Sequence, residues 1–175
     1  MEPTLKIGAR LVVRRIPIPL ELFGETIWPK VGWIAVFHPP EGAETQECGP
    51  AHHVVTPGGA ACDVVLPKES TVDLIKRIVA GPGEEMYVEQ GHVYRRAQSS
   101  EPFVRESDSY SKGCGANPQC NFPTPIRIPP GHWFMMGDNR GESDDSRDYG
   151  PIPSSWIVGF LAGIIRQTTP EGSPL

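Results

Sequence analysis

The chain has 175 residues, a formal net charge of −5 and 38% hydrophobic residues. This length suits one domain or a core with a sizeable insertion, and the negative charge gives no reason to expect nucleic-acid binding. No run of about 20 apolar residues occurs, and no signal-peptide hydrophobic region is present. We therefore expect no membrane span within the given residues, so that any anchor lies outside them.

Strand-like runs follow one another along the whole chain. They are rich in Val, Ile and aromatic residues and are bounded by Gly and Pro, which is typical of β-strands, whereas no long amphipathic helix stands out. Residues 85–96 are expected to fold back as a hairpin with Gln90-Gly91 at the turn. The sequence therefore predicts an all-β fold. The expected strands lie at 9–15, 32–38, 71–79, 85–96, 124–130, 132–136 and 156–166.

Two loop-rich segments, 39–63 and about 97–123, interrupt the strands, and each carries one pair of cysteines. Long loops without their own structure are usually functional or cross-linked. An even cysteine count in loop-like sequence predicts two disulfides in an oxidising compartment. The predicted pairs are Cys48 with Cys62 and Cys114 with Cys120.

Zinc binding is the alternative for the first pair, because His52 and His53 lie close to Cys48 and Cys62. Zinc sites usually have cysteines two to four residues apart, and neither pair has that spacing. The spacing favours disulfides over a metal, and no cofactor is expected.

Lys76 is the unusual residue of the run "TVDLIKRIV" at 71–79. In a strand, where side chains alternate, it lies in the middle of an apolar row. A helical period also fits part of the run, but the β-branched residues and the Gly-Pro-Gly that follows favour a strand. The apolar row is Val72, Leu74, Lys76 and Ile78.

Two interpretations of Lys76 remain open. Its ammonium could reach water at a sheet edge while its stem lies on apolar surface. Alternatively, burial could lower the amine pKa from about 10.4 by about 3–5 units, which would make it a general base for a serine hydroxyl. The strand by itself favours the first interpretation.

A cluster of acidic residues lies at 138–148, within "GDNRGESDDSRDYGPIP". It does not fit a calcium loop, because Arg140 and Glu142 occupy positions where that pattern has Asp or Asn. Two arginines inside the cluster indicate ion pairs rather than a bound cation.

Four segments of the chain resemble bacterial type I signal peptidases, peptidase family S26. The run "GDNRGESDDSRDYGPIP" (137–153) is similar to the last signature of that family, and "IKRIVAGPGEE" (75–85) is similar to its lysine signature. The run "MEPTLKIGARLVV" (1–13) resembles the segment that follows the nucleophile, and "GWIAVFHPP" (32–40) resembles an apolar strand. The order and the rough spacing match over about residues 1–166.

The resemblance implies a membrane-anchored serine endopeptidase with a Ser/Lys dyad, which cuts signal peptides after Ala-x-Ala. Lys76 matches the general base, and Ser143 matches the serine that orients this lysine. Asp145 and Arg147 match an ion pair that holds the site together, and Asp138 matches a structural acid beside it. A hydroxyl suits the role of Ser143, because a carboxylate would raise the lysine pKa.

The resemblance also implies where the nucleophile and the substrate belong. The family's serine would directly precede Met1, so the given chain is expected not to cleave signal peptides. The substrate is expected to bind as an added strand beside Asp73, Leu74 and Ile75, close to Met1 and Pro3.

The implied organisation is a catalytic β core of coiled antiparallel sheets at 1–84 and 124–166, with a disulfide-linked insertion at about 39–69. A smaller, disulfide-linked β subdomain is expected at 85–123, and a disordered tail at 167–175.

The expected partners are signal peptides of exported preproteins and the membrane surface. The implied location is the plasma membrane, with a single-pass anchor outside the given residues and an extracytoplasmic catalytic domain. Residues 22–29, "LFGETIWP", are expected to form an exposed loop or hairpin tip that touches the bilayer, unless Trp28 is buried in the core.

The sequence leaves two other functions open. One is a non-catalytic extracytoplasmic peptide-binding module with the same fold, and the other is an unrelated disulfide-rich binding domain.

Overall fold

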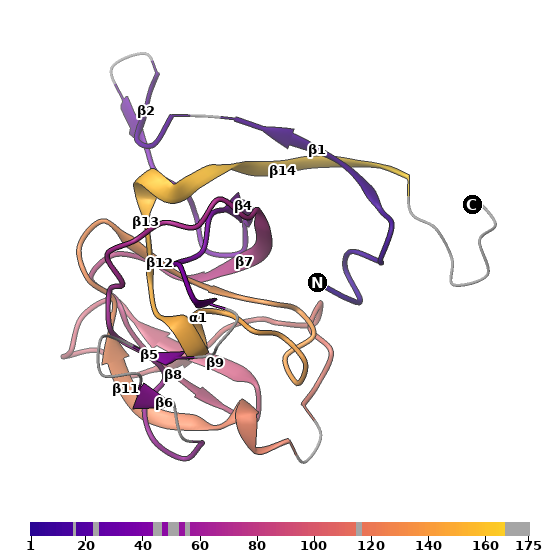
Figure 1. The fold of residues 1–175 in the computed structure, drawn as a ribbon. Helices are drawn as coiled ribbons and strands as arrows, with labels where there is room; N and C mark the ends of the chain where they lie inside the picture. Colours follow the sequence, from indigo (N-terminus) through magenta and orange to yellow (C-terminus); the bar gives the residue numbers. More distant parts are fainter. Residues whose placement is uncertain are drawn as a thin grey trace.

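The computed structural model describes residues 1–15, 17–22, 25–43, 47–48, 53–54, 57–114 and 117–166. Antiparallel strands dominate these residues, and the predicted all-β fold is confirmed (Figure 1). No helix of the described residues is long and apolar enough to cross a membrane. The tail at 167–175 and His52 lie outside the described residues.

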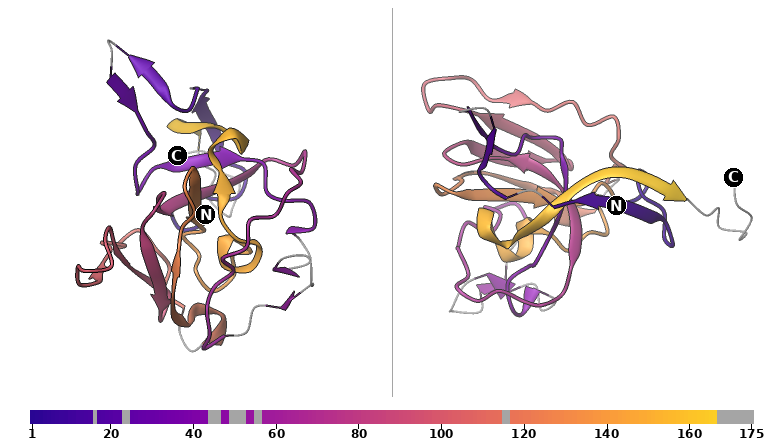
Figure 2. Two further views of the ribbon diagram at one scale, coloured as in Figure 1. Left: turned by 90° about the vertical axis from the view of Figure 1, so that its left-hand side faces the viewer. Right: turned by 90° about the horizontal axis from the view of Figure 1, so that it is seen from above.

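The larger sheet has six strands, and every pair of neighbours is antiparallel. Its outermost pair, β1 and β14, forms an arm that extends away from the rest of the molecule (Figures 1 and 2). In sheet order the strands are β1 (Arg10–Arg14), β14 (Ile157–Arg166), β4 (Ile34–Phe37), β7 (Leu74–Ala80), β12 (His132–Met136) and β13 (Ile152–Pro153).

The second sheet has four strands and contains the predicted hairpin. Gln90 and Gly91 both have positive φ, 51° and 80°, as a two-residue turn of this kind requires, so the hairpin prediction is confirmed. The predicted subdomain boundary at 123/124 falls within the last strand of this sheet. In sheet order the strands are β10 (Val104–Arg105), β9 (His92–Arg96), β8 (Glu85–Glu89) and β11 (Phe122–Arg127).

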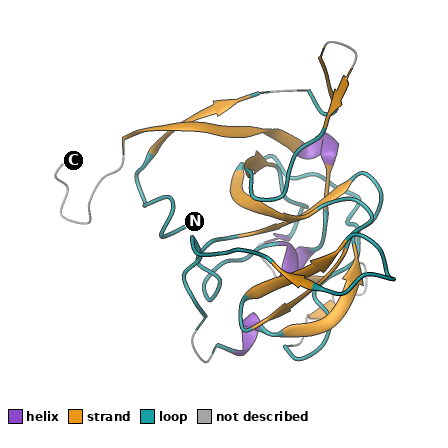
Figure 3. Ribbon diagram, turned by 180° about the vertical axis from the view of Figure 1, so that it is seen from behind, coloured by secondary structure: helices purple, strands orange, loops and turns teal. Residues whose placement is uncertain are grey.

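Short elements complete the described chain (Figure 3). The predicted loop-rich segments contain the short strands β5, β6 and β10, which the sequence did not suggest. Trp28 follows the hairpin of β2 and β3 and is 46% exposed, which excludes the buried alternative. The short elements are β2 (Leu20–Leu22), β3 (Glu25–Ile27), β5 (Glu47–Cys48), β6 (His53–Val54), η2 (Pro118–Cys120), α1 (Ser146–Tyr149) and η3 (Ser154–Trp156).

Both predicted disulfides are present. Cys48 is bonded to Cys62, with 5.6 Å between their Cα atoms, and Cys114 is bonded to Cys120, with 6.1 Å between theirs. The sulfurs of these pairs are therefore engaged with each other rather than available as thiolate ligands of zinc.

Strand β12 lies between two hydrophobic clusters, because its side chains alternate. Phe134 and Met136 point into the cluster shared with β8, β9 and β11, whereas Trp133 and Met135 point into the cluster shared with β4 and β14. Burial of each large apolar side chain stabilises the fold by about 1.5–3 kcal/mol. The second half of β7 is packed on both faces in the same way, which gives the residues at its start a rigid base.

Candidate active site

Lys76 and Ser143 meet at one end of the larger sheet. Lys76 lies on β7, and Ser143 lies in the loop between β12 and α1. The Lys76 Nζ donates a hydrogen bond to the Ser143 Oγ at 2.7 Å. Burial lowers the pKa of Lys76 and Arg147 acts in the same direction, although the charges of Asp145 and Asp144 oppose them. The surroundings therefore favour the neutral amine more than water does.

Gly137 makes room for this contact. A Cβ at this position would lie 2.2 Å from the Ser143 Oγ and 2.6 Å from the Ser143 Cβ, and 3.6 Å from the Lys76 Nζ. The Gly137 N–H also donates to the Asp145 carboxylate at 2.9 Å. Any larger residue at 137 would push Ser143 out of its present position.

Asp145 and Arg147 form a buried ion pair that fixes the loop carrying Ser143. The Arg147 Nε and Nη2 donate to the two carboxylate oxygens at 2.8 and 2.9 Å, and Nη2 also donates to the Ser143 carbonyl at 3.1 Å. Burial alone would raise the pKa of Asp145, but the charge and hydrogen bonds of Arg147 outweigh it, so this pKa lies below its usual value. Removal of one partner from such a pair typically costs 3–5 kcal/mol.

The same aspartate begins the short helix α1. Its side chain accepts a hydrogen bond from the Arg147 N–H, and the Asp148 carboxylate accepts one from the Asp145 N–H at 3.1 Å. This reciprocal capping ties the helix start to the loop.

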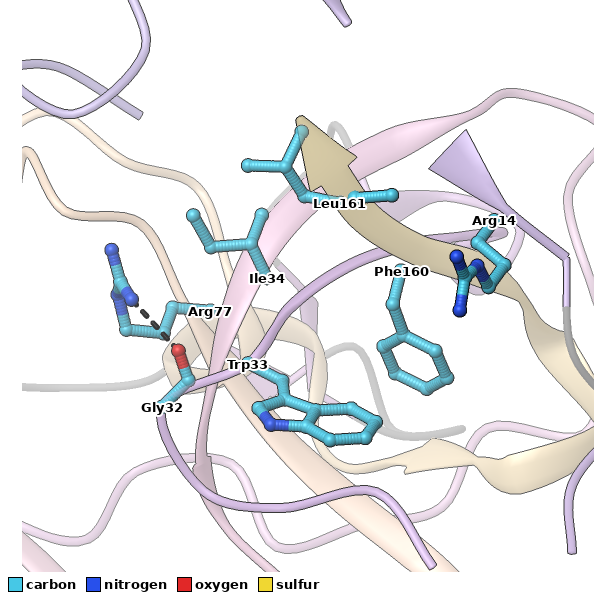
Figure 4. A pocket seen from close by; sticks show the side chains of 8 residues that line it. Arg14, Gly32, Trp33, Ile34, Arg77, Phe160 and Leu161 are labelled. Atoms are coloured by element: carbon cyan, nitrogen blue, oxygen red, sulfur yellow. Dashed lines mark hydrogen bonds between the residues drawn. The ribbon is translucent and has the colours of Figure 1, made fainter. Parts of the chain in front are cut away.

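Asp138 is buried and pairs with Arg77, which the sequence had not singled out. The Arg77 Nε and Nη2 donate to its two oxygens at 2.9 and 2.7 Å, and the Thr4 hydroxyl donates to it as well. The Arg77 Nη1 donates to the Gly32 carbonyl at 2.7 Å, at the wall of a cavity of about 480 Å³ (Figure 4). The Tyr110 ring centre lies 3.8 Å from the Arg77 Cζ.

These contacts hold the N-terminal turn against the strand of Lys76. The Leu5 N–H donates to the Met1 carbonyl at 3.0 Å, and Leu5 is buried, whereas Pro3 is exposed. The pKa of the Met1 α-amino group is lowered by burial and next by the charge of Lys76. The charge of Lys76 is therefore felt at the start of the described chain.

The predicted substrate edge is open on one side. Strand β4 pairs with Leu74 to Arg77, but β12 pairs only with Arg77 to Ala80. Among the described strands, none pairs with the second edge of residues 74–76. Asp73 directly precedes β7, and its carboxylate lies 3.3 Å from the His38 Nε2.

The chain as a whole matches a known protein family. Residues 1–165 match the family model described as "Signal peptidase, peptidase S26". The chain belongs to this family. The resemblance seen in the sequence is thereby confirmed.

Individual signal peptidases align with different fractions of this chain. The chain is 35% identical over 162 residues to the "Probable signal peptidase I-1" of Synechocystis sp.. The aligned residues cover 91% of this chain and 63% of that protein. The chain is 37% identical over 86 residues to the chloroplastic "Thylakoidal processing peptidase 1" of Arabidopsis thaliana, over 49% of the chain and 22% of that protein. A crystal structure of a signal peptidase I from Enterococcus faecalis V583 matches with a TM-score of 0.41 and 18% identity, over 78% and 98% of the two chains.

The chain therefore spans less than two thirds of the length of two of its curated relatives, 63% and 56% of two Synechocystis proteins.

Sequence reasoning placed Lys76, Ser143, Asp138, Asp145 and Arg147 together, and the structure brings all five to one end of the larger sheet. The sequence did not indicate that Arg77, Thr4, Tyr110 or Gly137 supports the site. Arg77 could have been identified from the sequence. Alternation places it on the face of β7 opposite Lys76, and a buried arginine there needs an acidic partner. No sequence pattern indicates Thr4 or Tyr110, since they contact Asp138 and Arg77 from distant parts of the chain.

Proposed function

We propose that this chain is the catalytic part of an endopeptidase that removes N-terminal signal peptides from exported proteins, with Lys76 as the general base. The observation that carries the proposal is the 2.7 Å contact between Lys76 and Ser143, at an amine whose pKa is lowered by burial. An amine accepts a proton only in its neutral form, so a lowered pKa makes it useful near neutral pH.

The nucleophile in this proposal is a serine that directly precedes Met1 in the native protein. The N-terminal turn supports this position, because its Thr4 hydroxyl donates to Asp138, the partner of Arg77 next to Lys76 on β7. The Thr4–Asp138–Arg77 contacts would hold the turn in place while the reaction proceeds.

The reaction then has two stages. The serine Oγ–H transfers its proton to the Lys76 Nζ as the Oγ bonds to the scissile carbonyl carbon, and the carbonyl electron pair moves to oxygen. Collapse of this intermediate breaks the C–N bond, and protonated Lys76 returns the proton to the leaving amine. Water, deprotonated by the same lysine, hydrolyses the acyl-enzyme and regenerates the serine.

The other site residues position the reacting groups in this proposal. Ser143 orients the Lys76 amine without adding a charge. Asp145 and Arg147 fix the loop of Ser143, and Asp138 links β7 to the N-terminal turn. Given the chain as it stands, without the serine, no cleavage is expected.

The substrate is proposed to add as a strand at the open edge formed by Asp73, Leu74 and Ile75, with Met1 and Pro3 nearby. Backbone hydrogen bonds would give affinity, and side-chain pockets would select the Ala-x-Ala sequence. No described strand pairs with this edge of β7 beside Lys76, which supports this placement.

The proposed setting is the outer side of the plasma membrane, with an anchor outside the given residues. Two disulfides fit an oxidising compartment. Exposed apolar side chains on the N-terminal turn, on the β1–β14 arm and directly after β3 would suit contact with the bilayer. They are Ile7, Val12, Trp28, Ile164 and Ile165.

The test uses the protein extended upstream with its native residues, in detergent or lipid. It should cleave a preprotein after its signal peptide, and Lys76→Ala should reduce kcat by at least about 100-fold, the usual contribution of a general base. Replacement of the upstream serine by alanine should abolish cleavage. Lys30→Ala, which removes an exposed lysine, is the matched control and should retain activity.

Full activity in the Lys76→Ala variant would refute the proposed base. A folded, extended protein that binds the signal peptide but never cleaves it would instead identify a non-catalytic peptide-binding module.

A further inference from the structure

A groove of about 560 Å³ lies on the Lys76 face of β7. It includes Lys76 and Leu74, but the roles above leave its other lining residues unused. Its walls come from the start of β7, from the loop of Ser143 and from residues 39–43. The lining residues that matter are Val72, Leu74, Lys76, Glu142, Asp144 and Tyr149.

Strand alternation indicates which part of a bound peptide would face this groove. Leu74 and Lys76 point to one face of β7, and Asp73 and Ile75 point to the other. Residues opposite each other in paired strands point to the same face. If three peptide residues lie opposite Asp73, Leu74 and Ile75, the outer two share the face of Ile75, and the middle one shares the groove with Leu74.

We propose that this groove is the specificity pocket for the middle residue of the tripeptide that precedes the cleaved bond, and that it selects a long basic side chain. The proposal rests on the proposed function and on the substrate edge given with it. The groove's volume far exceeds what a methyl group fills, so it suits the variable position of Ala-x-Ala rather than either alanine.

The chemistry of the walls favours lysine or arginine. Val72, which is 57% exposed, and Leu74 offer apolar surface for the side-chain stem. Glu142 and Asp144 place carboxylates at the rim, where an ammonium or guanidinium group would remain hydrated. The Glu142 carboxylate accepts a hydrogen bond from the neutral amide of Asn139 at 2.6 Å, and no ion pair within 4.0 Å involves Glu142 among the described residues.

The remaining charges that face the groove do not reverse this preference. Glu41 adds a third carboxylate, although Lys68 lies 3.5 Å from it in an exposed pair. Lys76 is the cationic residue of the lining, and burial shifts it towards the neutral form. The Tyr149 hydroxyl is buried and has no hydrogen-bond partner among the described residues, so the wall keeps one neutral polar group to offer.

The experiment compares three substrates that differ only at the middle position, with Lys, Gln or Glu in Ala-x-Ala. Binding to the chain as given is measured by fluorescence anisotropy of labelled peptides, and kcat/KM is measured with the protein extended upstream. We expect the order Lys, Gln, Glu in both. Exposed ion pairs of this kind change affinity by about 1.5- to 5-fold per carboxylate.

Glu142→Gln removes one rim charge and should reduce the ratio between Lys and Glu by about that factor. Glu89→Gln is the matched control, because Glu89 is an exposed carboxylate on β8 in the other sheet, and it should leave the ratio unchanged.

Equal binding of all three peptides, or a ratio that Glu142→Gln does not change, would overturn the groove assignment while the proposed function stands. Absence of any peptide binding or cleavage, whatever the middle residue, would instead count against the proposed function.

Discussion

Replacement of Gly137 by alanine is the sharpest test of how the site is assembled, because it alters none of the reacting groups. A Cβ at 137 would lie 2.2 Å from the Ser143 Oγ, and ordinary contact begins at about 3.4 Å. Ser143 must therefore retreat by about 1 Å. A shift of that size breaks its 2.7 Å hydrogen bond with Lys76.

The expected cost in rate follows from this displacement. Misplacement of a catalytic group by about 1 Å can reduce the rate by about 100-fold. Overpacking in a well-packed region should also destabilise the fold by about 1–3 kcal/mol. We therefore expect Gly137→Ala to lose about two orders of magnitude in kcat/KM while it remains folded.

The assay is cleavage of a signal-peptide substrate by the upstream-extended protein, with urea unfolding of the same samples. Gly163→Ala is the matched control, because a Cβ there meets nothing within 4 Å, and it should retain activity. A folded Gly137→Ala protein that keeps kcat/KM within about threefold would refute the role assigned to the Lys76–Ser143 contact.

Three further outcomes are expected. Arg77→Met should destabilise the protein by about 3–5 kcal/mol in urea unfolding, because it leaves the Asp138 carboxylate buried without its partner; an unchanged midpoint would contradict this ion pair. Burial raises the pKa of Asp148 to about 6, so stability should fall as pH rises from about 4 to 6. Asp148→Asn should remove that decrease and add about 1–3 kcal/mol at pH 7, and parallel stability curves for the two proteins would exclude it. Loss of the Cys114–Cys120 disulfide through replacement of both cysteines by serine should cost about 2–3 kcal/mol for so short a loop, and an unaltered thermal midpoint would oppose that estimate.

The strands could be predicted because local composition determines them. The hairpin of β8 and β9 is the clearest case, since Gln90-Gly91 supplies the two positive φ angles that its turn needs. Strand β12 was placed at its observed bounds, residues 132–136. By contrast, β5, β6 and β10 have two residues each and occupy segments rich in Gly and Pro, where pairing depends on neighbours far along the chain.

The candidate site was only partly predictable for a related reason. Periodicity could place Lys76 in an apolar row but could not choose between a solvent-seeking and a reactive lysine. The resemblance to signal peptidases supplied Ser143 as its partner. The support from Gly137, Thr4 and Tyr110 depends on close packing between segments, which no local pattern reveals.

The pKa of Lys76 decides whether this residue can act as the general base. Carbon-13 NMR of selectively labelled lysine Cε atoms in the upstream-extended protein would follow its titration, with Lys76→Arg to assign its signal. We expect a pKa below the ordinary lysine value of about 10.4, because burial disfavours the ammonium form. A Lys76 that titrates at or above that value would contradict its role as the general base.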